Sequence, residues 1–303
     1  MYGFYSGECF DAYKYLGAHI TENKVTFRTF APNALKIELI GEFNNWNGIE
    51  MKRTNDHKFF ECTVENAKPG MLYKYKIYNK NGGCVDHCDP YGFGMELRPN
   101  TASIIRDLSE YKFNDYEWMK RRSDCKDKPL NIYEVHLGSW RKKSDDTWYT
   151  YREISELLIP HVKENGYNYI EIMPLSEHPC DESWGYQNTG FFSPTSRYGT
   201  ASDLMYFIDK CHENNIGVIM DFVPVHFAID GFALANYDGT SLYEYPYEDI
   251  EMSQWGSKNF IHSRGEVRSF LQSAANYWFD EYHIDGLRVD ALSNIIYWQG
   301  NSD

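Results

Sequence analysis

The chain has 303 residues, of which 42% are hydrophobic and 17% aromatic, so it has enough apolar material for one large domain or two ordinary ones and is not a disordered chain. Lys and Arg number 30 against 44 Asp and Glu, and the net charge of -14 makes nucleic acids and anionic membranes poor partners. No apolar run approaches transmembrane length and the first residues do not form a secretory signal, so we expect a cytoplasmic protein.

The first 110 residues contain short segments of alternating polar and apolar residues, separated by turns rich in Pro, Gly and Asn. A two-residue period with such turns is typical of antiparallel strands, and it predicts a β-sandwich over residues 1–110. Residues 111–129 are polar and charged, and we interpret them as a linker. The predicted strands are 24–32, 35–43, 58–65 and 72–79.

Cys84 and Cys88 bracket His87 in "CVDHC", which raises the question of a metal site. No second Cys/His pair with zinc-like spacing follows, so we expect no metal and no cofactor. The seven cysteines are irregularly spaced, which favours a reduced protein over a disulfide scaffold.

From residue 130 the pattern changes to strand, loop and helix in repetition. Such a repeat predicts parallel strands with right-handed connections, and the long loops after each strand favour a TIM barrel. An open doubly wound sheet is the alternative, but no glycine-rich phosphate turn follows any strand. The predicted strands are 130–137, 167–175, 217–223 and 284–291, and the predicted helices are 150–166, 200–217 and 263–282.

A closed barrel of this type needs eight strands, and only four are predicted. We therefore expect residues 130–303 to be the N-terminal half of an incomplete (β/α)8 barrel. Two of the predicted helices open with a capping box, Thr150 with Glu153 and Ser263 with Glu266.

Four ionisable residues lie at or just beyond the ends of the last two predicted strands. Arg288 and Asp290 are two apart in one strand, so their side chains point to the same side. A charged pair is costly against apolar helices, so both should face the barrel interior, where Asp221 of the preceding strand and His226 beyond it can meet them. An arginine keeps a neighbouring carboxylate ionised and oriented, and such a carboxylate can act as a nucleophile.

Several segments resemble conserved regions of the α-amylase superfamily, the family 13 glycoside hydrolases and transferases. These are "DFVPVHF" and "GLRVDA", while "VHLGSW", "WGYQ" and "DGLRVDA" together resemble bacterial glycogen (1,4-α-glucan) branching enzymes. The resemblance covers essentially the whole chain. Val225 departs from the usual Gly before His226, and residues 246–260 differ from the commonest form of their loop.

The resemblance implies a role for each of these residues. Asp290 would be the nucleophile that forms a covalent glycosyl-enzyme, and Arg288 would keep it ionised. Tyr186 would form the floor of the subsite that holds the sugar being cleaved. Asp221 and His226 would bind that sugar and support Arg288.

Branching cleaves an α-1,4 bond and forms an α-1,6 bond with retention, which requires a second carboxylic acid about 5 Å from the nucleophile. The resemblance places that acid, a Glu, on the next barrel strand, outside residues 1–303. We therefore expect the N-terminal portion of a glycogen branching enzyme, a hexosyltransferase that is inactive in this form. A debranching or amylase-type hydrolase and a non-catalytic glycogen-binding protein remain as alternatives.

The N-terminal part resembles a carbohydrate-binding module of family 48, most clearly in "GEFNNWNG" (41–48). Trp46 in this segment either stacks on a glucan or packs at the sandwich edge or the domain interface. The expected partner of the protein is an α-glucan such as glycogen or amylose.

Overall fold

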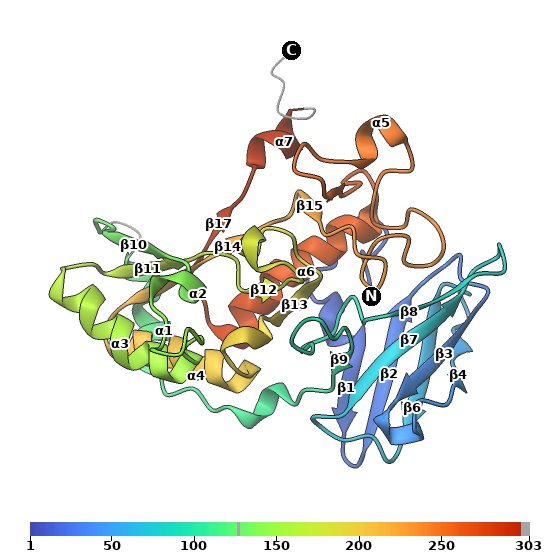
Figure 1. The fold of residues 1–303 in the computed structure, drawn as a ribbon, viewed down its shortest axis with the longest axis horizontal. Coiled ribbons are helices and arrows are strands. Elements are labelled where there is room, and N and C mark those ends of the chain that lie inside the picture. Colours follow the sequence, from blue (N-terminus) through green and yellow to red (C-terminus); the bar gives the residue numbers. More distant parts are fainter. Residues whose placement is uncertain (126–127, 298–303) are drawn as a thin grey trace.

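The computed structural model describes residues 1–125 and 128–297. Two packed antiparallel sheets occupy one side of the molecule, and a sheet of parallel strands with its helices occupies the other (Figure 1). One antiparallel sheet has the order β1 (Gly17–Thr21), β2 (Lys24–Phe30), β6 (Phe59–Val64), β5 (Lys52–Arg53). The other has the order β4 (Ile49–Glu50), β3 (Lys36–Gly41), β7 (Leu72–Tyr78), β8 (Cys84–His87), and β9 (Ser103–Ile104) also pairs with β7.

Alternating burial holds the two antiparallel sheets together. Phe27 of β2 and Tyr73 of β7 are fully buried, and their rings meet edge to face with centroids 4.9 Å apart. Along β7 every second residue is buried, as the two-residue period of its sequence predicts. The predicted β-sandwich is confirmed.

The second half of the chain forms one parallel sheet. Its strands pair in their sequence order: β10 (Ile132–Val135), β11 (Tyr169–Ile172), β14 (Gly217–Phe222) and β17 (Gly286–Val289). Three long helices lie between them: α3 (Tyr151–Glu164), α4 (Ala201–Glu213) and α6 (Gly265–Tyr282). All four predicted parallel strands are confirmed, in the order that the first half of a barrel requires.

Shorter elements form the connections. Two hairpins, β12 (Ser176–Glu177) with β13 (Gly190–Pro194) and β15 (His226–Phe227) with β16 (Lys258–Asn259), lie in the loops after β11 and β14. The short helices are α1 (Tyr116–Arg121), α2 (Leu137–Trp140), α5 (Glu248–Glu251) and α7 (Leu292–Ile296). Within 1–125 and 128–297 no helix is long and apolar enough to cross a membrane.

The start of α6 differs from the prediction. Thr150 and Glu153 form the predicted capping box of α3, but α6 begins at Gly265 without a side-chain cap, so the predicted box of Ser263 and Glu266 is wrong. The N-terminal segment crosses here, and a Cβ on Gly265 would lie 1.7 Å from the carbonyl oxygen of Tyr5. A long-range contact thus determines where α6 begins.

Residues that precede the sandwich in sequence pack on α6 of the other half. The hydroxyl of Ser269 donates to the carbonyl of Phe4 (2.8 Å), and the amide of Tyr13 donates to the hydroxyl of Ser273 (2.9 Å). Buried residues of both halves belong to one hydrophobic cluster. The domain limits at 110 and 130 stay a prediction, and the two halves are joined by far more than the connecting segment.

A buried ionic network fastens the connecting segment beneath the parallel sheet. Both ring nitrogens of His212 face carboxylates, that of Asp115 at 2.8 Å and that of Asp285 at 3.0 Å. Because carboxylates only accept, the ring must carry both protons and is a cation. Trp118 of α1 stacks on this ring and donates to Asp285 (2.8 Å), and His283 also contacts Asp115 (2.9 Å).

The network stabilises the fold most strongly in mildly acidic solution. Burial alone would lower the pKa of His212, but Asp115 and Asp285 raise it, so its contribution is full below the usual histidine value of about 6.5 and is lost as the pH rises through the folded-state pKa. Burial alone would raise the pKa of Asp115, but the two histidines lower it, so its contribution is lost only in strong acid.

We expect His212→Ala to lower the free energy of unfolding by about 3–5 kcal/mol at pH 5.5, because one partner of a buried charge network is removed, and by less at pH 8.5. Urea unfolding at the two pH values measures the difference. The matched control is His57→Ala, since His57 is exposed. An equal loss at both pH values would show that His212 is not protonated in the folded chain.

Candidate active site

The pairing of β14 with β17 places the charged residues together. In this register Asp221 lies beside Arg288, near the carboxyl end of both strands. One guanidinium nitrogen of Arg288, Nη1, lies 3.1 Å from each oxygen of Asp221 and 2.6 Å from Oδ1 of Asp290. The structure thus joins the three residues that the sequence predicted to meet, and the arginine lies between the two carboxylates.

Tyr186 completes this charged centre from the loop after β11. Its hydroxyl donates to Oδ2 of Asp221 at 2.6 Å. The backbone before it is tightly held, because Gly185 has φ +92° and a Cβ there would lie 2.5 Å from the carbonyl oxygen of Pro174. The ring is therefore fixed beside Asp221.

Three further ion pairs brace the same loop. Asp181 accepts from Arg197 at 2.6 Å and from Nε of Arg98, of the sandwich side, also at 2.6 Å. Arg197 also donates to buried Glu177 at 2.9 Å. Glu177 is therefore a structural carboxylate of this loop, and the loop is anchored from both halves of the molecule.

His226 lies next to the centre, on β15. Only 2% of the His226 surface is exposed, and Nδ1 has no hydrogen-bond partner within the described part of the chain. Burial lowers the pKa of His226 to about 4, against the opposing effect of Asp290. The ring is therefore neutral at pH 7. A buried polar atom of this kind is suited to bind a substrate hydroxyl.

Burial and charge set the protonation of the centre. Burial raises the pKa of Asp221 to about 6, although Tyr186 and Arg288 oppose the rise. Burial alone would lower the pKa of Arg288, but the carboxylates of Asp221 and Asp290 raise it further. At pH 7 the arginine is a cation that contacts the side chains of both Asp221 and Asp290.

Sequence reasoning missed one aromatic residue at this centre, Trp255. The ring of Trp255 lies over His226, with centroids 5.1 Å apart, and Gln187 donates to its carbonyl at 3.3 Å. Trp255 stands out only because its side chain is exposed, and exposure cannot be read from the sequence. Trp46 follows β3 and precedes β4 in the sandwich, where its side chain is 43% exposed, and its contact with a glucan stays a prediction.

Comparison with known proteins places both halves. Residues 15–92 match the model of carbohydrate-binding module 48 (isoamylase N-terminal domain), and residues 135–249 match that of the α-amylase catalytic domain. Residues 135–249 therefore belong to the α-amylase catalytic domain family. The predicted fold, a family 48 sandwich followed by the first half of an α-amylase barrel, is thereby confirmed.

Relatives similar to nearly the whole chain include bacterial 1,4-alpha-glucan branching enzymes. The chain is 47% identical to that of Fusobacterium nucleatum, over 99% of this chain and 49% of the relative. It is 49% identical to that of Halothermothrix orenii, over 98% of this chain and 48% of the relative. It is 45% identical to that of Bacillus subtilis, over 100% of this chain and 50% of the relative. The chain thus spans about half the length of these relatives.

Solved structures of the family agree with the fold. A candidate α-amylase from Salmonella typhimurium superimposes with a TM-score of 0.75 at 26% identity, over 95% of this chain and 44% of the other. A pullulanase from Paenibacillus barengoltzii superimposes with a TM-score of 0.72 at 22% identity, over 90% of this chain and 48% of the other. At that identity the second match describes the fold alone.

We expect Tyr186→Phe to raise the pKa of Asp221 above 6, because the hydroxyl that stabilises the ionised form is removed while the burial remains. Carboxyl carbon NMR of the chain across pH 4–8 measures the titration. Tyr2→Phe is the control, since Tyr2 is 97% exposed. An unchanged or lower titration midpoint of Asp221 would contradict the hydrogen bond from Tyr186 to Asp221.

Proposed function

We propose that this chain is the N-terminal portion of a 1,4-α-glucan branching enzyme of glycogen biosynthesis, acting in the cytoplasm on glycogen or amylose. The observation that carries the proposal is the bridge from Asp221 through Arg288 to Asp290, at the carboxyl ends of two barrel strands. Similarity to two branching enzymes over 99% and 98% of this chain supports this choice among the activities of the family.

In the proposed first step, a carboxylate oxygen of Asp290 attacks the anomeric carbon of a glucosyl unit. The bond from that carbon to O4 of the departing chain breaks, and O4 takes a proton from a general acid. Arg288 keeps Asp290 ionised, and Asp221, Tyr186 and His226 hold the glucosyl unit. The product is a glycosyl ester on Asp290.

In the second step, the O6 hydroxyl of an acceptor glucan attacks the anomeric carbon. The ester bond breaks, the hydroxyl proton passes to the conjugate base of the general acid, and Asp290 is restored. Two inversions leave the anomeric configuration unchanged. Transfer to O6 makes a branch, whereas transfer to water would be hydrolysis.

The centre described here does not supply the general acid. Asp221 already accepts from Tyr186 and Arg288, and Glu177 is buried against Arg197. Glu171 on β11 has a pKa raised by burial and by nearby Glu134. Within the described part of the chain, it forms no hydrogen bond or ion pair with Asp221 or Arg288. The proposal therefore assigns the acid to a strand that pairs beyond β17.

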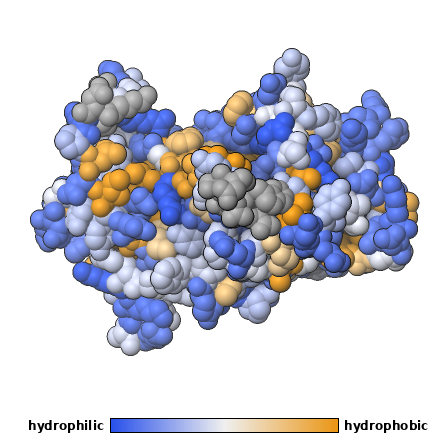
Figure 2. All heavy atoms as spheres, turned by 90° about the horizontal axis from the view of Figure 1, so that it is seen from above, coloured by the Kyte–Doolittle hydropathy of each residue, from blue (hydrophilic) through white to orange (hydrophobic). Residues whose placement is uncertain are grey.

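Apolar side chains around the open end of the parallel sheet are consistent with such a second half. Figure 2 shows hydrophobic residues gathered on the side of the molecule that carries this sheet. Among exposed residues of that part are Ile132, Val289, Leu292 and Ile296. Parallel sheets are normally covered on both faces, so further barrel units would bury these side chains.

Residues 1–303 alone should form no branches in amylose, because general acid catalysis, worth about 10²–10⁴-fold, is missing. The same chain joined in frame to the C-terminal half of the Fusobacterium nucleatum relative should be active. Loss of iodine staining, with α-1,6 linkages and no new reducing ends, reports branching. New reducing ends would indicate a hydrolase, and glucan binding without turnover a non-catalytic protein.

In the barrel-completed chain, Asp290→Asn should abolish branching while glycogen binding stays nearly intact, since the amide keeps the shape but is not an anionic nucleophile. Branching is measured on amylose, and binding by affinity electrophoresis in glycogen gels. Asp230→Asn is the matched control on a carboxylate outside the centre. More than a few per cent of residual turnover would remove Asp290 from this role.

A further inference from the structure

An arginine of the sandwich side reaches across to the loop that carries Tyr186. Arg98 lies between β8 and β9, and its guanidinium binds both carboxylate oxygens of Asp181, with Nε 2.6 Å from Oδ1 and Nη2 on Oδ2. Asp181 belongs to the loop after β11, so this pair crosses from one half of the molecule to the other. Such two-point pairing makes an arginine–carboxylate contact both strong and directional.

Arg98 is itself held in place. The backbone on either side of it is closed by two hydrogen bonds, from the amide of Glu96 to the carbonyl of Ala102 and from the amide of Ala102 to the carboxylate of Glu96, both of 3.0 Å. The guanidinium also lies over the ring of Trp148, with its carbon 5.4 Å from the ring centroid. Arg98 is therefore a fixed point of the sandwich side and not a freely moving surface side chain.

Asp181 is shared with an arginine of the barrel side. Nε and Nη2 of Arg197 also donate to its Oδ1, at 2.8 and 2.6 Å, and only 2% of the Arg197 side chain is exposed. Hydrogen bonds from Arg98 and Arg197 lower the pKa of Asp181 to about 2, against the opposing effect of burial. Isolated surface ion pairs contribute little, but two-point pairs within a network are the exception. Asp181 is therefore ionised at pH 7 and joined to both halves at once.

A short path of hydrogen bonds leads from Asp181 to Tyr186. Asp181 begins the single 3-10 turn Asp181–Ser183. Its carbonyl accepts from the amide of Trp184 at 3.1 Å, and the carbonyl of Ser183 accepts from the amide of Tyr186 at 2.9 Å. The position of the Tyr186 ring is thus set by a turn that starts at the carboxylate which both arginines bind.

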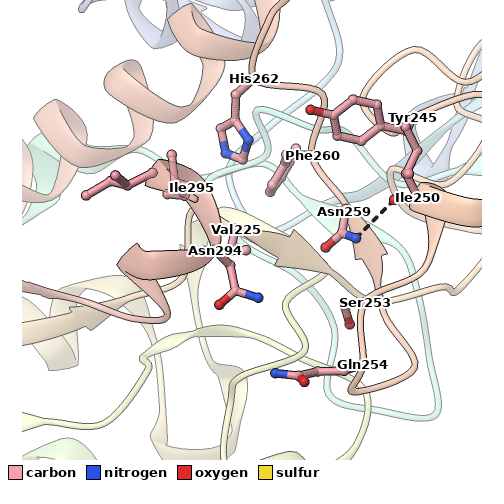
Figure 3. A pocket seen from close by; sticks show the side chains of 11 residues that line it. Val225, Tyr245, Ile250, Ser253, Gln254, Asn259, Phe260, His262, Asn294 and Ile295 are labelled. Carbon is pink, nitrogen blue, oxygen red and sulfur yellow. Dashed lines mark hydrogen bonds between the residues drawn. The ribbon is translucent and has the colours of Figure 1, made fainter. Parts of the chain in front are cut away.

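The loop after β14 is shaped in another way. A cavity of about 250 Å³ lies between this loop and α7, and Figure 3 shows two of its lining residues bonded to each other, Asn259 donating to the carbonyl of Ile250 at 3.0 Å. Neither Arg98 nor Asp181 lines this cavity. A change at Arg98 should therefore reach the charged centre through the loop after β11.

We propose that Arg98 is a positioning residue of the branching reaction, which fixes Asp181 and thereby holds the Tyr186 hydroxyl against Asp221. The sandwich then contributes to the active site through an ion pair, in addition to any glucan that it binds. A displacement of about 1 Å in a contact residue can lower turnover about 100-fold, so a remote anchor of this kind has a measurable effect. The effect on turnover rests on the proposed function, whereas the effect on Asp221 does not.

The first test reads the hydrogen bond of Tyr186 without turnover. In residues 1–303, carboxyl carbon NMR follows the titration of Asp221, whose pKa the Tyr186 hydroxyl lowers. Arg98→Ala and Asp181→Asn should each raise the Asp221 midpoint, by no more than Tyr186→Phe does. Arg98→Lys keeps the charge but loses the two-point fork, so its midpoint should lie between those of Arg98→Ala and the unchanged chain. An unchanged or lower midpoint in Arg98→Ala would overturn the positioning role.

The second test reads turnover in the barrel-completed chain. Arg98→Ala should lower the branching turnover about 10–100-fold while glycogen binding in affinity gels stays nearly unchanged. The matched control is Lys14→Ala, which removes another ion pair between the two halves, to Asp280 of α6 at 3.2 Å. This control should change neither the turnover nor the Asp221 midpoint.

The outcomes separate the two proposals. A barrel-completed chain that forms no branches would refute the proposed function, while the Asp221 titration still tests the role of Arg98. A chain that branches amylose equally well with and without Arg98 would refute the positioning role alone. Thermal unfolding of each variant shows whether a loss reflects the site or the fold, and Arg98→Lys keeps the test valid if Arg98→Ala unfolds.

Discussion

The pairing of β14 with β17 is the constraint on which the site depends. It sets Asp221 beside Arg288 and leaves Asp290 one step beyond the strand, where the same guanidinium nitrogen reaches both carboxylates. Tyr186, His226 and Trp255 come from loops after two different strands. Tyr186 is positioned by its hydrogen bond to Asp221, and the rings of His226 and Trp255 contact each other. A shift of one residue would turn the arginine toward the helices and separate the group.

The ionised groups of this centre lower the stability of the folded chain. Only 1% of the Asp221 surface is exposed. Its pKa of about 6 means that the folded chain binds a proton at Asp221 more tightly than the unfolded chain does. Stability from this group therefore falls as the pH rises from about 4 through 6. Buried charges of this kind are expensive and are retained where a function needs them.

Period and spacing predicted the architecture well, because they report which side of an element is buried. The four parallel strands and the side shared by Arg288 and Asp290 follow from that information alone. Roles for Tyr186 and His226 came from the resemblance, since nothing local marks a loop residue that meets a distant strand. The beginning of α6 and the position of Trp255 could not be predicted from the sequence, because both depend on contacts between segments far apart in the chain.

The packing of residues 1–14 against α6 has a consequence for synthesis of the chain. The hydrogen bonds of Ser269 to Phe4 and of Tyr13 to Ser273 join positions 265 and 260 residues apart. Residues 1–14 leave the ribosome long before α6 and must therefore wait for it, while the sandwich between them can already pair its strands. Contacts of such sequence separation form late, so the N-terminal segment should dock as a closing step, after the parallel sheet has assembled.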